Sequence, residues 1–166
     1  MNKQDMLILY EYNAWSTAKI LDTASNLTPE QFLEPVPFPY GSLRSTLVHA
    51  AYAEWVWRKR WEGSPKNQKW NAEDFPTLDT LRARWADEEP RLINFVANVT
   101  DEQLHTRFKY VSSEGTPHER VVWEAMAHVI THGMQHKTEA AAILTGFGYS
   151  PGDIDLIVYL NEVRVP

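Results

Sequence analysis

The sequence predicts an all-α protein, a four-helix bundle with long crossover connections, and three observations support this prediction. Apolar residues recur at helical spacing in four long segments. Capping residues, glycines and prolines mark the ends of these segments. No segment has the regularly spaced alternation of polar and apolar residues that is typical of a sheet. With 166 residues, the chain is long enough to close one core, so we expect residues 1–166 to form a single domain.

The first helix is expected over about Lys3–Asn26, which contains neither glycine nor proline. Thr28, Pro29 and Gln31 then match the N-cap, N1 and N3 positions of a short helical restart. The run PVPFPY follows, and its three prolines require an extended connection. The first helix therefore cannot continue into the second.

The second helix is expected from the N-cap Ser42 to about Glu62, just before a glycine. Thr77 is a suitable N-cap for a third helix that ends near Val99. Pro90 lies inside this third segment and should kink it.

The second half of the chain repeats the order of the first. A restart signal at residues 100–103 matches the one after the first helix. Residues 107–117 are expected to form an irregular excursion, and residues 118–144 a fourth helix that ends at glycines. The apolar tail DIDLIVYLNE should form a short packed helix or cover a subunit contact.

Composition excludes several classes of function. The chain has no cysteine, so it forms no disulfide and has no thiolate nucleophile of its own. The net charge is −6, and the only cluster of basic residues is Arg58, Lys59 and Arg60, so on electrostatic grounds we expect no nucleic-acid partner. We find no apolar run long enough for a membrane span and no signal peptide, so we expect a cytoplasmic protein with no membrane partner.

The stretch HVITHGMQH places three histidines four residues apart on the predicted fourth helix. A helical wheel puts His136 inside the apolar face, His132 on its shoulder and His128 at its margin. Four-residue spacing brings His132 and His136 close enough to share one cation. His49, on an apolar stripe of the second helix, is the expected third donor. The sequence thus predicts a metal site made of His49, His132 and His136.

The alternative is that these histidines only pack in the core. Each neutral imidazole would then need a donor and an acceptor, and the surrounding faces are mostly aliphatic. A zincin motif is excluded, because Gly133 stands where HExxH requires glutamate. The paired Glu-x-x-His elements of di-iron bundles are also missing. Glu139 follows His136 by three residues and is either an acceptor for a ligand N–H or a solvated charge.

Four stretches together resemble the DinB and YfiT-like superfamily of metal-dependent four-helix bundles. They are YNAW, LTPEQF, GSLRSTLVHAAYAEWVW and HVITHGMQHKTEAAAILTGFG, in the family's order. The resemblance places the family's metal triad on His49, His132 and His136. It also implies a homodimer. Some members of the superfamily are thiol S-transferases or thiol-dependent isomerases that use low-molecular-weight thiols such as bacillithiol or mycothiol.

Three histidine ligands leave a divalent ion with an open position, as in catalytic sites. We therefore expect a metal-dependent thiol S-transferase that acts on a small-molecule substrate. A hydrolase that uses metal-activated water and a non-catalytic metal- or ligand-binding dimer are the alternatives. Zinc, nickel, iron and manganese all suit three imidazoles, and the sequence identifies no catalytic base. Tyr12, Asn13, Tyr52 and Trp57 are expected to line the pocket or to pack in the core.

A second apolar stripe on the second helix raises the question of subunit contacts. It consists of Leu43, Leu47, Ala50, Trp57 and Trp61. Such a stripe either faces a partner subunit or is buried within the chain's own core.

Overall fold

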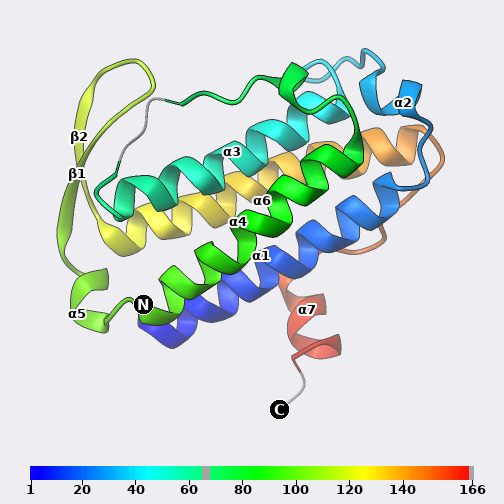
Figure 1. The fold of residues 1–166 in the computed structure, drawn as a ribbon. Coiled ribbons are helices and arrows are strands. Elements are labelled where there is room, and N and C mark those ends of the chain that lie inside the picture. Colours follow the sequence, from blue (N-terminus) through cyan, green and yellow to red (C-terminus); the bar gives the residue numbers. More distant parts are fainter. Residues whose placement is uncertain (65–67, 165–166) are drawn as a thin grey trace.

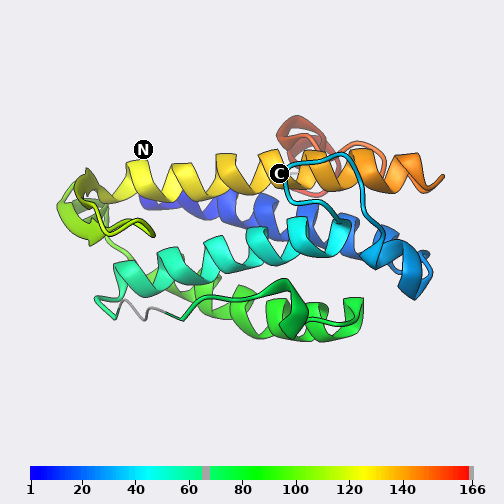
Figure 2. The ribbon, with the colours of Figure 1, turned by 90° about the horizontal axis from the view of Figure 1, so that it is seen from above.

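The computed structural model describes residues 1–64 and 68–164, in which four long helices lie side by side (Figure 1). They are α1 (Lys3–Ala24), α3 (Leu43–Trp61), α4 (Leu78–Asn98) and α6 (Val122–Gly146). In Figures 1 and 2, α1 and α6 run in one direction and α3 and α4 in the other. Because α3 and α4 are parallel, the chain between them crosses back along the bundle and carries a short 3₁₀ helix, η1 (Ala72–Asp74). The predicted four-helix bundle with a long crossover is confirmed.

The two helices that carry the predicted histidines, α3 and α6, are neighbours in the bundle. α3 packs against α6 and α4, and α1 packs against the same two helices. α3 and α6 are therefore adjacent along their length, which lets side chains from both meet between them. α4 continues through Pro90 as one helix, and the kink expected at this residue stays a prediction.

The two predicted restarts are short helices with complete capping boxes. α2 (Pro29–Leu33) is capped by Thr28, and α5 (Asp101–Leu104) by Thr100. The tail forms α7 (Leu156–Glu162), whose Tyr159 ring lies against the rings of Tyr12 and Trp15 on α1. Each of these short helices was expected from capping or apolar character.

A β-hairpin replaces the irregular excursion predicted for residues 107–117, so that prediction was wrong. β1 (Arg107–Val111) pairs antiparallel with β2 (Pro117–Val121), and Phe108 and Tyr110 are half-buried between exposed neighbours. Gly115 closes the connection with a φ of 86°, a conformation that glycine adopts without strain. The fourth helix was also expected to begin at residue 118. It begins at Val122 because residues 118–121 belong to β2.

Two apolar clusters fill the bundle, and polar residues lie between them. One cluster includes Ile20, Leu47, Leu81 and Leu144, and the other includes Met6, Val96, Met126 and Val129. Each of the four long helices has at least one buried polar residue between these two groups in sequence. These residues include Asn13, Ser16 and Thr17 on α1, Glu54 on α3, Glu88 on α4, and His136 and Lys137 on α6. The bundle therefore has a polar layer near its middle, at the height of the histidines.

Within the described residues, no helix combines the length and apolar character needed to cross a bilayer.

Candidate metal centre

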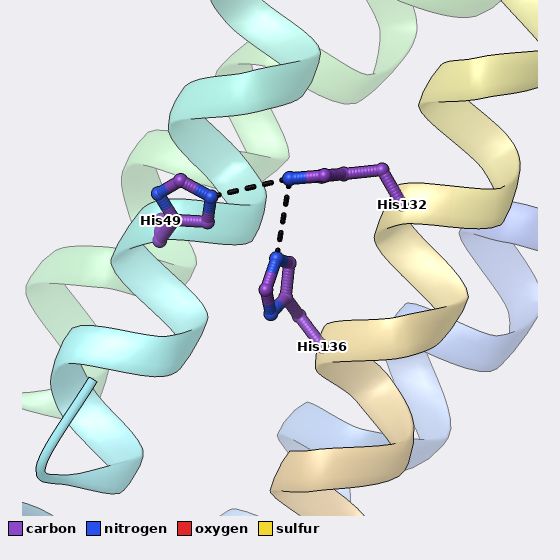
Figure 3. A group of neighbouring side chains, drawn as sticks. All are labelled: His49, His132 and His136. Carbon is purple, nitrogen blue, oxygen red and sulfur yellow. Dashed lines mark hydrogen bonds between the residues drawn. The ribbon is translucent and has the colours of Figure 1, made fainter. Parts of the chain in front are cut away.

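His49, His132 and His136 converge between α3 and α6 (Figure 3). The Nε2 atom of His132 lies 3.2 Å from Nε2 of His49 and 3.2 Å from Nε2 of His136. One ring nitrogen from each residue lies within 4.8 Å of the others. For comparison, two ligand atoms about 2.1 Å from one tetrahedral cation are roughly 3.4 Å apart. The spacing of the two close pairs therefore suits a shared divalent ion.

The possible positions of the protons on these rings also favour a shared cation. Nδ1 of His136 lies 2.8 Å from Oε2 of Glu139, so it donates its proton to that carboxylate and leaves a lone pair on Nε2. In a neutral ring, Nε2 of His132 carries either a proton or a lone pair. It cannot donate to His136 and accept from His49 at the same time. One of the two 3.2 Å contacts is therefore unsatisfied without a cation, and a cation that accepts three lone pairs satisfies both.

Neutral histidines are favoured at this place by burial. Desolvation, followed by the nearby His136, lowers the pKa of His49 from 6.5 to about 4. Desolvation also lowers the pKa of His132 to about 4, with further contributions from His136, His49 and His128. Both rings are consequently unprotonated at neutral pH, which is the form that binds a metal.

Tyr40 covers one side of the histidines and was not identified from the sequence. Its ring stacks on His49 with centroids 4.3 Å apart and meets His136 edge-on at 5.2 Å. It belongs to the proline-rich connection between α2 and α3. Its pKa is raised by burial and by Glu139, so the phenol stays protonated.

The other histidines lie outside this cluster. His128 is exposed, and its ring packs edge-on against Trp57 with centroids 5.4 Å apart. His105 follows α5 and contacts the carbonyl oxygen of Asp101. His118 lies in β2 and stacks on Tyr110. The helical wheel had placed His128 at the margin of the buried face, and the structure agrees.

A cavity of about 910 Å³ opens beside the histidines, between α3 and the hairpin. His49 and His132 line it, and so do Tyr52 and Trp57, two of the four residues expected at the pocket wall. The other two, Tyr12 and Asn13, are buried elsewhere. The Tyr12 hydroxyl donates to the carbonyl oxygen of Ile154, and Asn13 lies in the polar layer of the bundle.

A buried ion network behind the histidines escaped the sequence analysis. Lys137, next to His136 on α6, is 1 % exposed, and its ammonium group donates to Oδ1 of Asn13 and to Oγ of Ser16, both at 2.7 Å. Asn13 in turn donates to Glu54 at 2.7 Å, and the Trp85 indole donates to the same carboxylate at 2.9 Å. The network joins the four long helices and fixes α3 relative to α6, which the histidine cluster requires.

The second stripe of α3 is largely buried within the chain itself. Leu43 and Leu47 are fully buried, and Ala50 and Trp57 also belong to the core. Trp61 stacks on Phe95 of α4 with ring centroids 5.7 Å apart. The stripe is thus explained by the chain's own packing and does not indicate a partner subunit.

Comparison with known proteins agrees with this architecture. The model of the DinB family matches residues 1–163. The chain is also similar to Protein DinB of Bacillus subtilis (strain 168), with 23% identity over 162 residues, and the match covers 92% of this chain and 91% of that protein.

Proposed function

We propose that this chain, which belongs to the DinB family, is a metal-dependent thiol S-transferase with His49, His132 and His136 as its metal ligands. The observation that carries the proposal is the convergence of three Nε2 atoms beside a cavity that is large enough for a small molecule and is lined by two of these histidines, His49 and His132. The DinB family and the three-histidine cluster both fit a metal-binding protein.

A divalent cation with three imidazole ligands and an open position would lower the pKa of a thiol or water that binds there. Two other side chains hold the histidine rings in position. Glu139 orients His136 through its Nδ1 proton, and Tyr40 packs over His49. The cavity leaves His49 and His132 accessible from the hairpin side.

We propose a thiol as the nucleophile, and a small molecule must bring it because the chain has no cysteine. Without any cysteine, sulfur chemistry requires a small thiol that enters through the cavity. In the proposed reaction the thiol loses its proton to solvent, and its sulfur attacks an electrophilic carbon. A carbon–sulfur bond forms, and the bond to the leaving group breaks with its electron pair. No side chain of the site needs to act as a covalent nucleophile.

The proposal is tested by turnover of a generic electrophile, chlorodinitrobenzene, with mercaptoethanol as the thiol. We expect zinc-loaded protein to release chloride at a rate that depends on the thiol and falls to background after chelation. The His132→Ala variant should be as slow as the chelated protein, and His128→Ala should keep most of the rate. Turnover by zinc-loaded protein without thiol would contradict the transferase and favour metal-assisted hydrolysis.

The homodimer implied by the family resemblance is part of this proposal. Light scattering at micromolar concentration tests it, and a mass of one chain at all concentrations would contradict it.

A further inference from the structure

The cavity beside the histidines follows one face of α3. The α3 residues that line it occupy positions separated by three or four residues, which is the period of one helical face: His49, Tyr52, Ala53, Val56, Trp57 and Arg60. Arg60 lies eleven positions after His49, so their Cα atoms are about 16 Å apart along the helix axis. The Arg60 side chain leans toward the start of the helix and shortens this gap. The cavity is therefore an elongated groove with a histidine end and an arginine end.

Arg60 differs from the two basic residues before it. Arg58 forms a bidentate ion pair with Glu88, and Lys59 pairs with Glu62 at 2.9 Å. Among the described residues, Arg60 has no carboxylate partner within ion-pair distance. Its Nη2 donates to the carbonyl oxygen of Val111 at 3.1 Å, and this neutral contact leaves the charge uncompensated.

Two aromatic rings hold the Arg60 guanidinium in the groove. Its central carbon lies 4.7 Å from the ring centroid of Trp57 and 5.2 Å from that of Tyr110. These cation–π contacts fix the plane of the group without neutralising it. Burial lowers the pKa of Arg60, which reflects lost solvation that an anion facing the guanidinium would replace.

The wall of the groove is cationic although the whole chain carries a net charge of −6. Among the described residues that line it, Arg60, Lys69 and Lys109 are basic and none is acidic. Lys69 and Lys109 are exposed, and Lys109 faces Glu119 across the hairpin, so Arg60 contributes most of the fixed positive charge. A groove of this kind concentrates anions.

We infer that Arg60 binds an oxyanion group, such as a carboxylate, at one end of an elongated small molecule whose other end reaches the three histidines. This inference names the ligand class of the proposed transferase and so rests on that function. The guanidinium fork binds the two oxygens of a carboxylate, while Tyr52, Ala53 and Val56 contact the apolar middle of the molecule.

Matched pairs of thiols test the inference by binding rather than by turnover. Two acids, mercaptohexanoate and mercaptooctanoate, carry the thiol and the carboxylate at opposite ends. Each is titrated calorimetrically into zinc-loaded protein and compared with the alcohol of equal length, mercaptohexanol or mercaptooctanol. We expect the acid to bind about tenfold more tightly than the alcohol of equal length, because a charge-assisted hydrogen bond contributes on that scale. The preference should be greater for the longer pair, which reaches farther from the histidines toward Arg60.

Arg60→Gln should abolish the preference for the acid, and Arg60→Lys should leave an intermediate preference because it keeps the charge but loses the fork. The matched control is Arg91→Gln, which removes an exposed arginine of α4 that pairs with Asp87. It should keep the preference, and circular dichroism should show that each variant is folded. Equal affinity for acid and alcohol, or a preference that survives in Arg60→Gln, would overturn the inference.

The binding assay also separates this inference from the proposed function. If the acid preference depends on Arg60 but no thiol-dependent turnover occurs, the transferase is wrong and the anion site stands. If turnover depends on thiol but acid and alcohol bind equally, the transferase stands and the anion site is wrong.

Discussion

The carboxylate of Glu139, a residue about one turn after His136 on α6, lies 2.8 Å from Nδ1 of His136. The other ring nitrogen of His136, Nε2, belongs to the histidine cluster. The contact with Glu139 fixes the tautomer of His136 and raises the basicity of its Nε2 atom. We predict that Glu139→Gln lowers the affinity for zinc about ten- to a hundredfold, since such outer partners typically contribute that much. Competition with a chromophoric chelator measures the change.

Thr138→Ala is the control for this prediction. Thr138 is exposed on the neighbouring position of α6, and its hydroxyl donates only to the carbonyl oxygen of Met134. Its removal should leave zinc affinity unchanged. If Glu139→Gln binds zinc as tightly as Thr138→Ala, the carboxylate does not support the cluster.

The metal-free protein should lose stability as the pH falls from about 6.5 toward 4. Burial lowers the pKa of His49 and His132 to about 4, whereas the unfolded chain has the ordinary value of 6.5. Within this window the unfolded state binds more protons, so stability rises with pH and is lost on acidification. The charged or titratable groups facing the two rings are His136, His128, Glu139 and Tyr40.

Urea denaturation in the presence of a chelator measures this dependence. The double variant His49→Gln, His132→Gln should have a smaller decrease in stability between pH 6.5 and 4 than the wild type. An identical decrease in both proteins would show that other groups cause it.

The buried ammonium group of Lys137 should be essential for stability. Lys137→Met removes the cation and leaves acceptors on Asn13 and Ser16 unpaired beside the buried Glu54 carboxylate. Removing one partner of a buried ion network costs about 3–5 kcal/mol. We expect a loss of that size in the free energy of unfolding, measured by urea denaturation.

Lys59→Met provides the comparison, because Lys59 pairs with Glu62 near the surface and such pairs contribute about 0–1 kcal/mol. A Lys137→Met variant as stable as Lys59→Met would mean that the network contributes little to the fold.

Local sequence signals were sufficient for most of the fold. The TPEQ and TDEQ restarts predict two short helices because a threonine hydroxyl and a glutamine three residues later satisfy free backbone donors. The histidine cluster could also be predicted from the sequence, since helical periodicity alone places His49, His132 and His136 on apolar faces. What periodicity cannot supply is the distance between two helices, which depends on how α3 and α6 pack.

Other features depend on contacts between distant segments. β1 and β2 have only five residues each, and their alternation is too short to distinguish from an irregular loop. Lys137 lies four residues after Gly133 and three before Ala140, a spacing that is compatible with a buried position, but the sequence did not single it out. Its charge argues against burial until Asn13 and Ser16 are seen to accept its protons. Arg60 stood out only as part of a basic run, and its aromatic neighbour Tyr110 comes from the unpredicted hairpin.

Metal content tests the central claim most directly, because the account requires three imidazoles from two helices to share one cation. The protein and its single-histidine variants are loaded with zinc, passed through a desalting column and subjected to elemental analysis. The wild type and His128→Ala should each retain about one zinc per chain, and His132→Ala should retain almost none, as two histidines hold the ion weakly. A full equivalent of zinc in folded His132→Ala would contradict the account.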